Sequence, residues 1–303
     1  MFETDRRDFL RCMAWAGAGV VWTLSGGVPS SRALAQAVLK PGDFHFVQIS
    51  DTHIGFNKEA NPDALATARV AIARINALPM RPELVLHTGD LTHSQKPGEF
   101  DTASGLLQEL STGAVFTVPG EHDVFEDDGR EYLARFGKGS AGNGWRSFDS
   151  HGVHFVGLVN VLSFKSGGVG ALGAEQLAWL EKDLAGYSAS APIVVFTHIP
   201  LWAVYPDWGW VTSDGQEALS YLRRFGSVTV LNGHIHQVLQ KVEGHVTFHT
   251  AYSTAYPQPA PGVGSGPGPL KVPAEELRAH LGVREVSFRA SDGALALTDS
   301  KLG

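Results

Sequence analysis

The chain has 303 residues, of which 43% are hydrophobic and 18% charged, and its formal net charge is −7. Such a composition is typical of a globular protein with ample apolar material for one large core. The negative net charge argues against a polyanion-binding surface, so we expect no nucleic acid polymer among its partners.

The first 35 residues differ in composition from the rest of the chain. Arg6 and Arg7 precede a weakly apolar stretch over residues 12–28, and small residues follow at 33–35. This pattern resembles a twin-arginine export signal, which predicts export through the twin-arginine machinery and a periplasmic or secreted protein. An amphipathic N-terminal helix is the alternative. The apolar part is short for a membrane anchor, so we expect no stable membrane span after cleavage.

The remaining residues, 36–303, are expected to form a single domain without disulfides, because Cys12 is the only cysteine and lies inside the signal. Apolar runs rich in Val, Ile and Phe predict strands over residues 44–50, 83–88, 114–118, 153–159, 192–197, 228–232 and 245–250. Amphipathic spacing predicts helices over residues 61–78, with Asn61 as the cap and Pro62 at the first helical position, 173–184 and 214–225. Residues 257–269 read as a surface loop and 284–297 as a hairpin. The alternation predicts an α/β layered fold.

Polar side chains follow five of these strands, at the point where each strand ends. They are Asp51 and His53 after the first strand, Asp90 after the second, Glu121 and His122 after the third, His198 after strand 192–197, and His234 and His236 after strand 228–232. In open α/β sheets, ligand crevices form at this edge, so we expect these side chains to converge.

The convergent residues are carboxylates and imidazoles, without thiolates. Such donors suit zinc, manganese or iron. The two-residue spacing in Asp51-Thr52-His53 and in His234-Ile235-His236 lets both side chains of an extended loop reach metal from one side. Each pair alone is better explained as a capping aspartate or a hydrogen-bonded histidine, but five such segments, each after a strand, favour a metal site.

The same segments resemble the five motifs of the calcineurin-like metallophosphoesterases, which include purple acid phosphatases and bacterial cyclic-nucleotide phosphodiesterases. The motifs are Asp51-Thr52-His53, Gly89-Asp90, Gly120-Glu121-His122-Asp123, Thr197-His198 and Gly233-His234-Ile235-His236. The resemblance runs from about Phe44 to His249 and implies a four-layer α-β-β-α sandwich of two mixed sheets flanked by helices. It implies that Asp51, His53 and His236 hold one metal ion, that Asp90 bridges two ions, and that His198 and His234 hold the second.

Two ions about 3.5 to 4 Å apart can clamp a phosphoryl oxygen and generate a hydroxide nucleophile from bound water. By resemblance, His122 points at the leaving-group oxygen, where it would act as a general acid. Asp123 either orients His122 or is a turn or cap residue. The sequence therefore predicts an exported phosphoesterase acting on a small phosphate ester. A cyclic-nucleotide or other phosphodiesterase, a non-catalytic metal- or phosphate-binding protein, and a hydrolase of a different ester are the alternatives.

Glu121 stands where the family usually has a ligand asparagine. With two divalent ions, two aspartates and a bridging hydroxide, the usual site carries one positive formal charge, and Glu121 would neutralise it. A trivalent ion would restore that charge, so we expect Glu121 to ligate the second ion and to favour Fe3+ paired with Fe2+, Mn2+ or Zn2+. The alternative is that Glu121 turns away to cap the following turn.

Two further features bear on the site. His93, three residues after Asp90, replaces the metal-binding tyrosine of purple acid phosphatases, and either binds metal or phosphate or is a hydrogen-bonded loop residue. The segment 201–210 contains four aromatic residues, which would form either a wall over the substrate or a lid that packs on itself.

Overall fold

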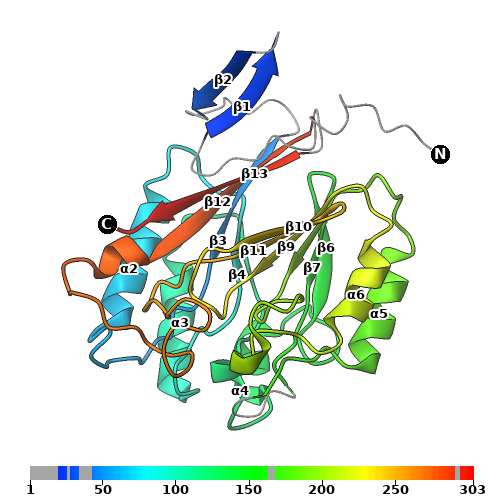
Figure 1. Cartoon of the computed structure of the whole chain (residues 1–303). Coiled ribbons are helices and arrows are strands. Elements are labelled where there is room, and N and C mark those ends of the chain that lie inside the picture. Colours follow the sequence, from blue (N-terminus) through cyan, green and yellow to red (C-terminus); the bar gives the residue numbers. More distant parts are fainter. Residues whose placement is uncertain (1–19, 26–27, 34–42, 163–167, 291–293) are drawn as a thin grey trace.

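The computed structural model describes residues 20–25, 28–33, 43–162, 168–290 and 294–303 (Figure 1). From residue 43 onward these residues build two β-sheets. The strands of the first sheet are β3 (Phe44–Ile49), β4 (Leu84–His87), β5 (Ala114–Thr117), β12 (Gly282–Arg289) and β13 (Ala294–Lys301). The strands of the second are β6 (Arg146–Ser150), β7 (Val153–Gly157), β8 (Ile193–Phe196), β9 (Val228–Asn232), β10 (Gln240–Glu243) and β11 (Val246–Thr250).

Both sheets are mixed, as the sequence predicted. The first has the order β13-β12-β3-β4-β5, with β3, β4 and β5 parallel. Strand β12 is antiparallel to both of its neighbours, so β13 runs in the same direction as β3. The second has the order β10-β11-β9-β8-β7-β6, with β7, β8, β9 and β11 parallel and the two edge strands antiparallel. The carboxyl ends of the parallel strands therefore share one edge within each sheet.

Side chains alternate between the two faces of each strand, and this alternation builds three hydrophobic layers. In β3, Phe44 and Phe46 point into a core shared with the second sheet, whereas Val47 and Ile49 contribute to the core beneath the helices of the first sheet. Phe196 of β8 lies in the same shared core, which joins the two sheets face to face.

Helices cover the two outer faces of the paired sheets (Figure 1). Helices α2 and α3 pack on the first sheet, and α5 and α6 on the second, which confirms the four-layer α-β-β-α sandwich. The helices of the described ranges are α2 (Ala64–Asn76), α3 (Pro97–Gln108), α4 (Arg130–Phe136), α5 (Ala174–Leu184) and α6 (Gly215–Leu222), with 3-10 turns η1 (Glu121–Asp123), η2 (Pro206–Trp208) and η3 (Leu277–His280).

The predicted start of the first helix was wrong. Asp63, not Asn61, caps α2, because its side chain accepts a hydrogen bond from the amide of Ala66 at 2.9 Å. Asn61 is buried and donates instead to Thr67 Oγ1 and to the main-chain oxygen of Ala255. Its side-chain oxygen accepts a hydrogen bond from the amide of Asp63 at 3.0 Å, so Asn61 shapes the turn before the helix and does not cap the helix itself.

The N-terminal segment contributes only a small ribbon to the described structure. Strands β1 (Val20–Ser25) and β2 (Val28–Ala33) pair antiparallel in a sheet of their own. Arg6 and Arg7 lie outside the described residues, so the export signal stays a prediction. Among the helices of the described ranges, none combines the length and the apolar composition that crossing a membrane requires.

Candidate metal centre

The structure brings all seven predicted metal ligands together at the carboxyl ends of their strands. They come from the loops after β3, β4, β5, β8 and β9, are all buried, and comprise Asp51, His53, Asp90, Glu121, His198, His234 and His236. The edge predicted from the sequence is thus the edge where they meet, and their binding of metal stays a prediction.

The first group of side chains is Asp51, His53 and His236, whose donor atoms lie within 4.8 Å of one another. Nε2 of His236 is 3.3 Å from Asp51 Oδ1 and 3.2 Å from His53 Nε2. Two imidazole nitrogens and a carboxylate oxygen therefore face a common point, as the ligands of one cation would.

The second group is Glu121, His198 and His234. Glu121 Oε1 lies 3.0 Å from His234 Nδ1, and Glu121 Oε2 lies 2.8 Å from His198 Nε2. Asp90 lies between the two groups, because its Oδ2 is 3.4 Å from His53 Nε2 and 3.5 Å from His198 Nε2. One carboxylate oxygen is thus within reach of both groups.

The imidazoles of His198 and His236 are each fixed by a hydrogen bond at Nδ1, while their Nε2 atoms face the carboxylates. Nδ1 of His198 donates to the main-chain oxygen of Thr88 at 2.7 Å, and Nδ1 of His236 donates to that of Tyr256 at 2.6 Å. Since each Nδ1 carries a proton, a neutral ring presents its Nε2 lone pair to the carboxylates, which is the arrangement that metal-ligating histidines need.

The backbone at the site adopts a rarely populated conformation. Eight non-glycine residues of the described ranges have positive φ, and five of them are predicted ligands: Asp51, His53, Asp90, His234 and His236, with φ between 40° and 69°. Left-handed backbone costs about 1 to 3 kcal/mol per residue and persists where the surrounding structure enforces it. The strained backbone therefore lowers the stability of the fold, and it directs these side chains toward the site.

Two motif glycines permit the close packing of the loops. A Cβ on Gly89, which has φ +96°, would lie 2.4 Å from His198 Nδ1, and a Cβ on Gly120 would lie 2.0 Å from Asp90 Oδ1. Any side chain at either position would displace a predicted ligand. The two glycines therefore allow the predicted ligands to keep their positions.

The residues present fit a metal pair. Glu121 Oε2 and His198 Nε2 are buried and lie 2.8 Å from each other, and no other described residue forms a hydrogen bond with either atom. Burial raises the pKa of the Glu121 carboxyl, but His234 and His198 outweigh this effect and hold that pKa well below its usual range. Burial conversely lowers the pKa of His198, but Asp90 and Glu121 raise it well above the usual value. A buried carboxylate that stays ionised, with imidazole nitrogens directly beside it, is suited to binding cations.

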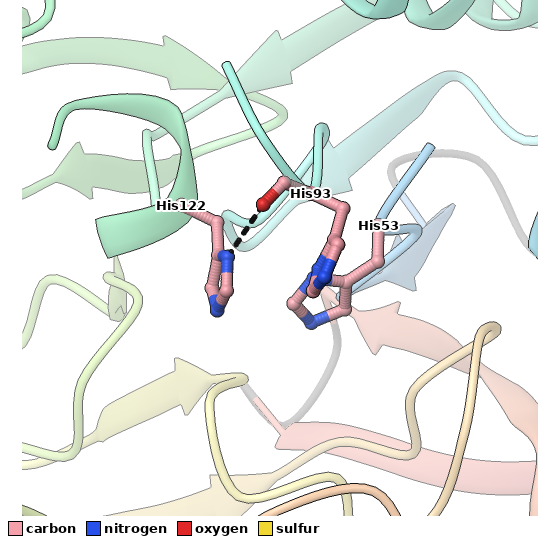
Figure 2. A group of neighbouring side chains, drawn as sticks. All are labelled: His53, His93 and His122. Atoms are coloured by element: carbon pink, nitrogen blue, oxygen red, sulfur yellow. Dashed lines mark hydrogen bonds between the residues drawn. The ribbon is translucent and has the colours of Figure 1, made fainter. Parts of the chain in front are cut away.

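His122 lies at the open side of the two groups and is only partly buried. Its Nδ1 donates to the main-chain oxygen of His93 at 2.8 Å (Figure 2), and its main-chain amide donates to Asp90 Oδ1 at 2.9 Å. Burial lowers the pKa of His122, but the carboxylates of Asp90 and Glu121 outweigh it, so that the pKa is raised. The raised pKa favours the cationic ring that a proton donor requires.

Asp123 does not orient the imidazole of His122. The carboxylate of Asp123 is fully buried and accepts hydrogen bonds from the amides of Leu91, Thr92 and Gly120 and from the Thr92 hydroxyl, at 2.8 to 3.0 Å. Of the two alternatives left open by the sequence, Asp123 is the turn residue, because the His93 carbonyl already occupies the hydrogen-bonding nitrogen of His122.

Sequence reasoning missed Tyr256 and left His93 undecided. The Tyr256 hydroxyl lies 3.2 Å from His53 Nε2, and its main-chain oxygen holds His236. His93 stacks on His122 with ring centroids 4.9 Å apart, and burial lowers its pKa to about 4. No motif marks Tyr256, since it reaches the site only through the fold.

The aromatic segment 201–210 packs on itself and on the core. Trp202 lies against Phe248 of β11, Trp210 is fully buried, and Trp208 contacts both Trp210 and Tyr205, with centroids 5.1 Å apart in each pair. The self-packing alternative therefore describes this segment. Near His122 the exposed aromatic ring is Phe125, whose centroid lies 5.7 Å from that of His122.

A four-layer sandwich with carboxylate and imidazole donors at one edge defines a class of metal-dependent hydrolases. The family model of calcineurin-like phosphoesterases matches residues 44–238, and the chain belongs to this family. It is accordingly a metal-dependent hydrolase of phosphate esters.

Two curated relatives and one solved structure illustrate the relationship. The chain is 28% identical over 228 residues to a probable glycerophosphodiester phosphodiesterase of Arcobacter nitrofigilis, covering 69% of this chain and 78% of that protein. It is 24% identical over 233 residues to a probable cyclic nucleotide phosphodiesterase of Psychrobacter arcticus, covering 71% and 81%. A dimetal phosphatase from Danio rerio shares the fold, with a TM-score of 0.62 at 17% identity, covering 86% of this chain and 98% of that one.

Proposed function

We propose that this protein is a dinuclear-metal phosphoesterase that hydrolyses small phosphate esters, with His122 donating a proton to the leaving group. The observation that carries this proposal is the position of Asp90 Oδ2, at 3.4 Å and 3.5 Å from one imidazole of each ligand group. A carboxylate shared in this way suits two neighbouring ions. When bound, the ion pair would supply Lewis-acid polarisation of the phosphoryl group and activation of water.

His122 supplies the proton in this proposal. Because its Nδ1 proton is held by the His93 carbonyl, the cationic ring has one other proton to give, at Nε2. The hydrogen bond from the main-chain amide of His122 to Asp90 Oδ1 fixes the main chain of His122 beside the shared carboxylate. Departure of the leaving-group oxygen with this proton avoids an alkoxide, which matters most for poor leaving groups.

Phosphodiesters are the narrower candidate substrate class. The similarity of the chain to two relatives supports this class, because one is named a probable glycerophosphodiester phosphodiesterase and the other a probable cyclic nucleotide phosphodiesterase. The test is to load the purified protein with manganese, zinc, cobalt or iron and compare bis(p-nitrophenyl) phosphate, p-nitrophenyl phosphate, glycerophosphodiesters and cyclic nucleotides. We expect a higher kcat/KM for diesters. Absence of hydrolysis of every ester with every metal would overturn the proposed function.

The identity of the metals is a further part of the proposal. Glu121 lies within the second group, close to both His198 and His234, and does not turn away to cap the following turn. This supports Glu121 as a ligand and, through its extra negative charge, a pair of ferric iron with divalent iron, manganese or zinc.

Two substitutions test the role of this charge. Glu121→Gln retains the length of the side chain, and Glu121→Asn restores the usual family residue. After expression in iron-containing medium, metal analysis and Mössbauer spectroscopy should find trivalent iron in the wild type and divalent ions in both variants. Unchanged metal identity, oxidation state and occupancy in both would contradict the proposed preference.

A further inference from the structure

Among the four imidazoles of the ligand groups, His53 has another imidazole beside its Nδ1. His198 and His236 each donate from Nδ1 to a main-chain oxygen. Nδ1 of His53 instead lies 3.4 Å from Nδ1 of His93, a second imidazole (Figure 2). The partner of His53 is thus a side chain, which can be changed by mutation without altering the backbone.

The neighbours of His53 identify the nitrogen that faces the metal site. Its Nε2 lies 3.4 Å from Asp90 Oδ2, 3.2 Å from His236 Nε2 and 3.2 Å from the Tyr256 hydroxyl. A neutral imidazole that offers the Nε2 lone pair carries its proton on Nδ1. That proton needs an acceptor, because the ring of His53 is buried.

The only way for His93 to accept this proton is to leave its own Nδ1 unprotonated. His93 must then carry its proton on Nε2, and the two rings form a directed hydrogen bond from His53 to His93. The contact at 3.4 Å is long but within reach of such a bond. The tautomer of a predicted ligand is therefore linked to the tautomer of a residue outside the ligand set.

His93 is itself well fixed. Its amide donates to the main-chain oxygen of Ile54 at 2.9 Å, and its ring meets Phe56 edge-on with centroids 5.0 Å apart. On the other side the ring stacks on His122 at an interplanar angle of 19°. A ring held by these contacts can act as a rigid support for its neighbours.

We propose that His93 is a positioning residue that sets the tautomer and orientation of His53 by accepting a hydrogen bond at Nδ1, while its main-chain oxygen and stacked ring orient His122. The inference rests on the proposed metal site. It links a predicted metal ligand in the loop after β3 with the proton donor after β5 through one residue of the loop after β4. Partners of this kind typically raise metal affinity about 10- to 100-fold.

Two variants distinguish the effect of the hydrogen-bond acceptor of His93 from the effect of its stacked ring. His93→Phe keeps a ring for stacking but lacks an acceptor, and His93→Asn supplies an amide oxygen near the position of Nδ1. Both retain the main-chain oxygen that holds His122. Zinc and manganese binding should be measured by calorimetry and by chelator competition, with circular dichroism in EDTA to verify that each variant is folded.

We expect His93→Phe to bind one of two ions about 10- to 100-fold more weakly and the other as tightly as wild type, and His93→Asn to recover most of the loss. Equal affinity of His93→Phe and wild type for both ions would overturn the proposal, as would equally weak binding by the two variants. Wild type that binds only one ion would instead contradict the proposed dinuclear site, so the two failures are distinguishable.

The tautomers can also be observed directly. In zinc-loaded protein labelled with 15N-histidine, long-range proton–nitrogen spectra distinguish Nδ1-protonated from Nε2-protonated rings, and the spectrum of His93→Asn assigns the signals of His93. We expect an Nε2-protonated His93 and an Nδ1-protonated His53. An Nδ1-protonated His93 would overturn the inference independently of any affinity.

Discussion

Asp123 Oδ1 accepts hydrogen bonds from both the main-chain amide and the hydroxyl of Thr92, each at 2.8 Å. The two residues lie in different loops, one after β4 and one after β5, and these loops carry Asp90 and Glu121. The spacing of the two ligand-bearing loops is therefore fixed by a carboxylate that does not itself belong to the ligand groups.

Replacement of Asp123 should destabilise the protein strongly. Asp123→Ala would leave the amides of Leu91, Thr92 and Gly120 without their acceptor in a buried position. We expect the free energy of unfolding to fall by about 3 to 5 kcal/mol in urea titrations with EDTA present. The control is Glu126→Ala, an exposed acid in the following loop, for which we expect a change of less than about 0.5 kcal/mol. Equal stability of the two variants would contradict the role of Asp123.

Loss of the proton donor should slow turnover without removing metal. For His122→Ala we expect kcat to fall about 10²- to 10⁴-fold with alkyl esters and much less with p-nitrophenyl esters, because a good leaving group needs no proton. Metal content is measured on the same preparations. If the variant loses a metal ion, His122 is a ligand and another group donates the proton.

Removal of metal should lower the melting temperature, because the predicted ligands come from both sheets. Asp51 and Asp90 follow strands of the first sheet, whereas His198 and His234 follow strands of the second. An ion present at 100 times its Kd adds about 2.7 kcal/mol to stability. Differential scanning calorimetry with manganese and with EDTA measures the shift. Asp90→Ala is the control, in which the shift should largely vanish, and an equal shift in this variant would count against Asp90 as a shared ligand.

A buried histidine far from the metal centre should make stability depend on pH. His154, only 2% exposed, contacts Asp149 at 2.9 Å and Asp183 at 2.8 Å. Burial lowers the pKa of His154, but the two carboxylates outweigh it, so the folded-state pKa lies above the unfolded one. The Tyr187 ring packs on His154, and the Tyr187 hydroxyl donates to Asp149, so Tyr187 covers one face of the His154 ring.

The sign of this pH dependence follows from the raised pKa. The stabilisation by His154 is fully present below the unfolded pKa of about 6.5 and is lost as pH rises through the folded pKa. Urea unfolding of metal-free protein should therefore give a larger difference between wild type and His154→Asn at pH 6 than at pH 9. The same difference at both pH values would show that His154 does not bind an additional proton in the folded state.

We propose that Arg6 and Arg7 direct folded export, since the twin-arginine route carries folded proteins and suits a chain that binds metal. A fusion of residues 1–40 to a reporter that functions only after folded export should be exported. The double substitution Arg6→Lys with Arg7→Lys should abolish export. Unaffected export of the double variant would contradict the proposal.

Much of the fold could be predicted because the buried strands have continuous apolar runs that are easily recognised in the sequence. The predicted ligands directly follow these strands, so their common edge could be predicted as well. The strands with few buried side chains escaped prediction: β10 reads QKVE and is largely exposed. Helix α3 was missed because Gly98 and Gly105 weaken its helical pattern, although Pro97 in the first turn and buried Phe100, Ala103 and Leu106 gave a usable signal. Local composition thus decided which elements could be recognised.

The details of the site depend on tertiary contacts that no local pattern encodes. Tyr256 lies far along the chain from His53, yet its hydroxyl is 3.2 Å from that ring. The left-handed conformation of His53 and His236 likewise depends on the surrounding loops, because histidine tolerates this conformation better than most residues but adopts it in only a small fraction of cases. The contact between His53 and His93 arises in the same way.

The parallel strands place the predicted metal ligands at one end of the sheets and leave the other end without any of them. The turn between β10 and β11 lies at the amino end of β11, whereas the predicted ligands lie beyond the carboxyl ends of their strands. Gly244 and His245 in this turn are exposed. A linker inserted there would tether the protein to a bead or electrode with its metal-binding edge facing the solution, so immobilised protein could be loaded, stripped and assayed repeatedly in flow.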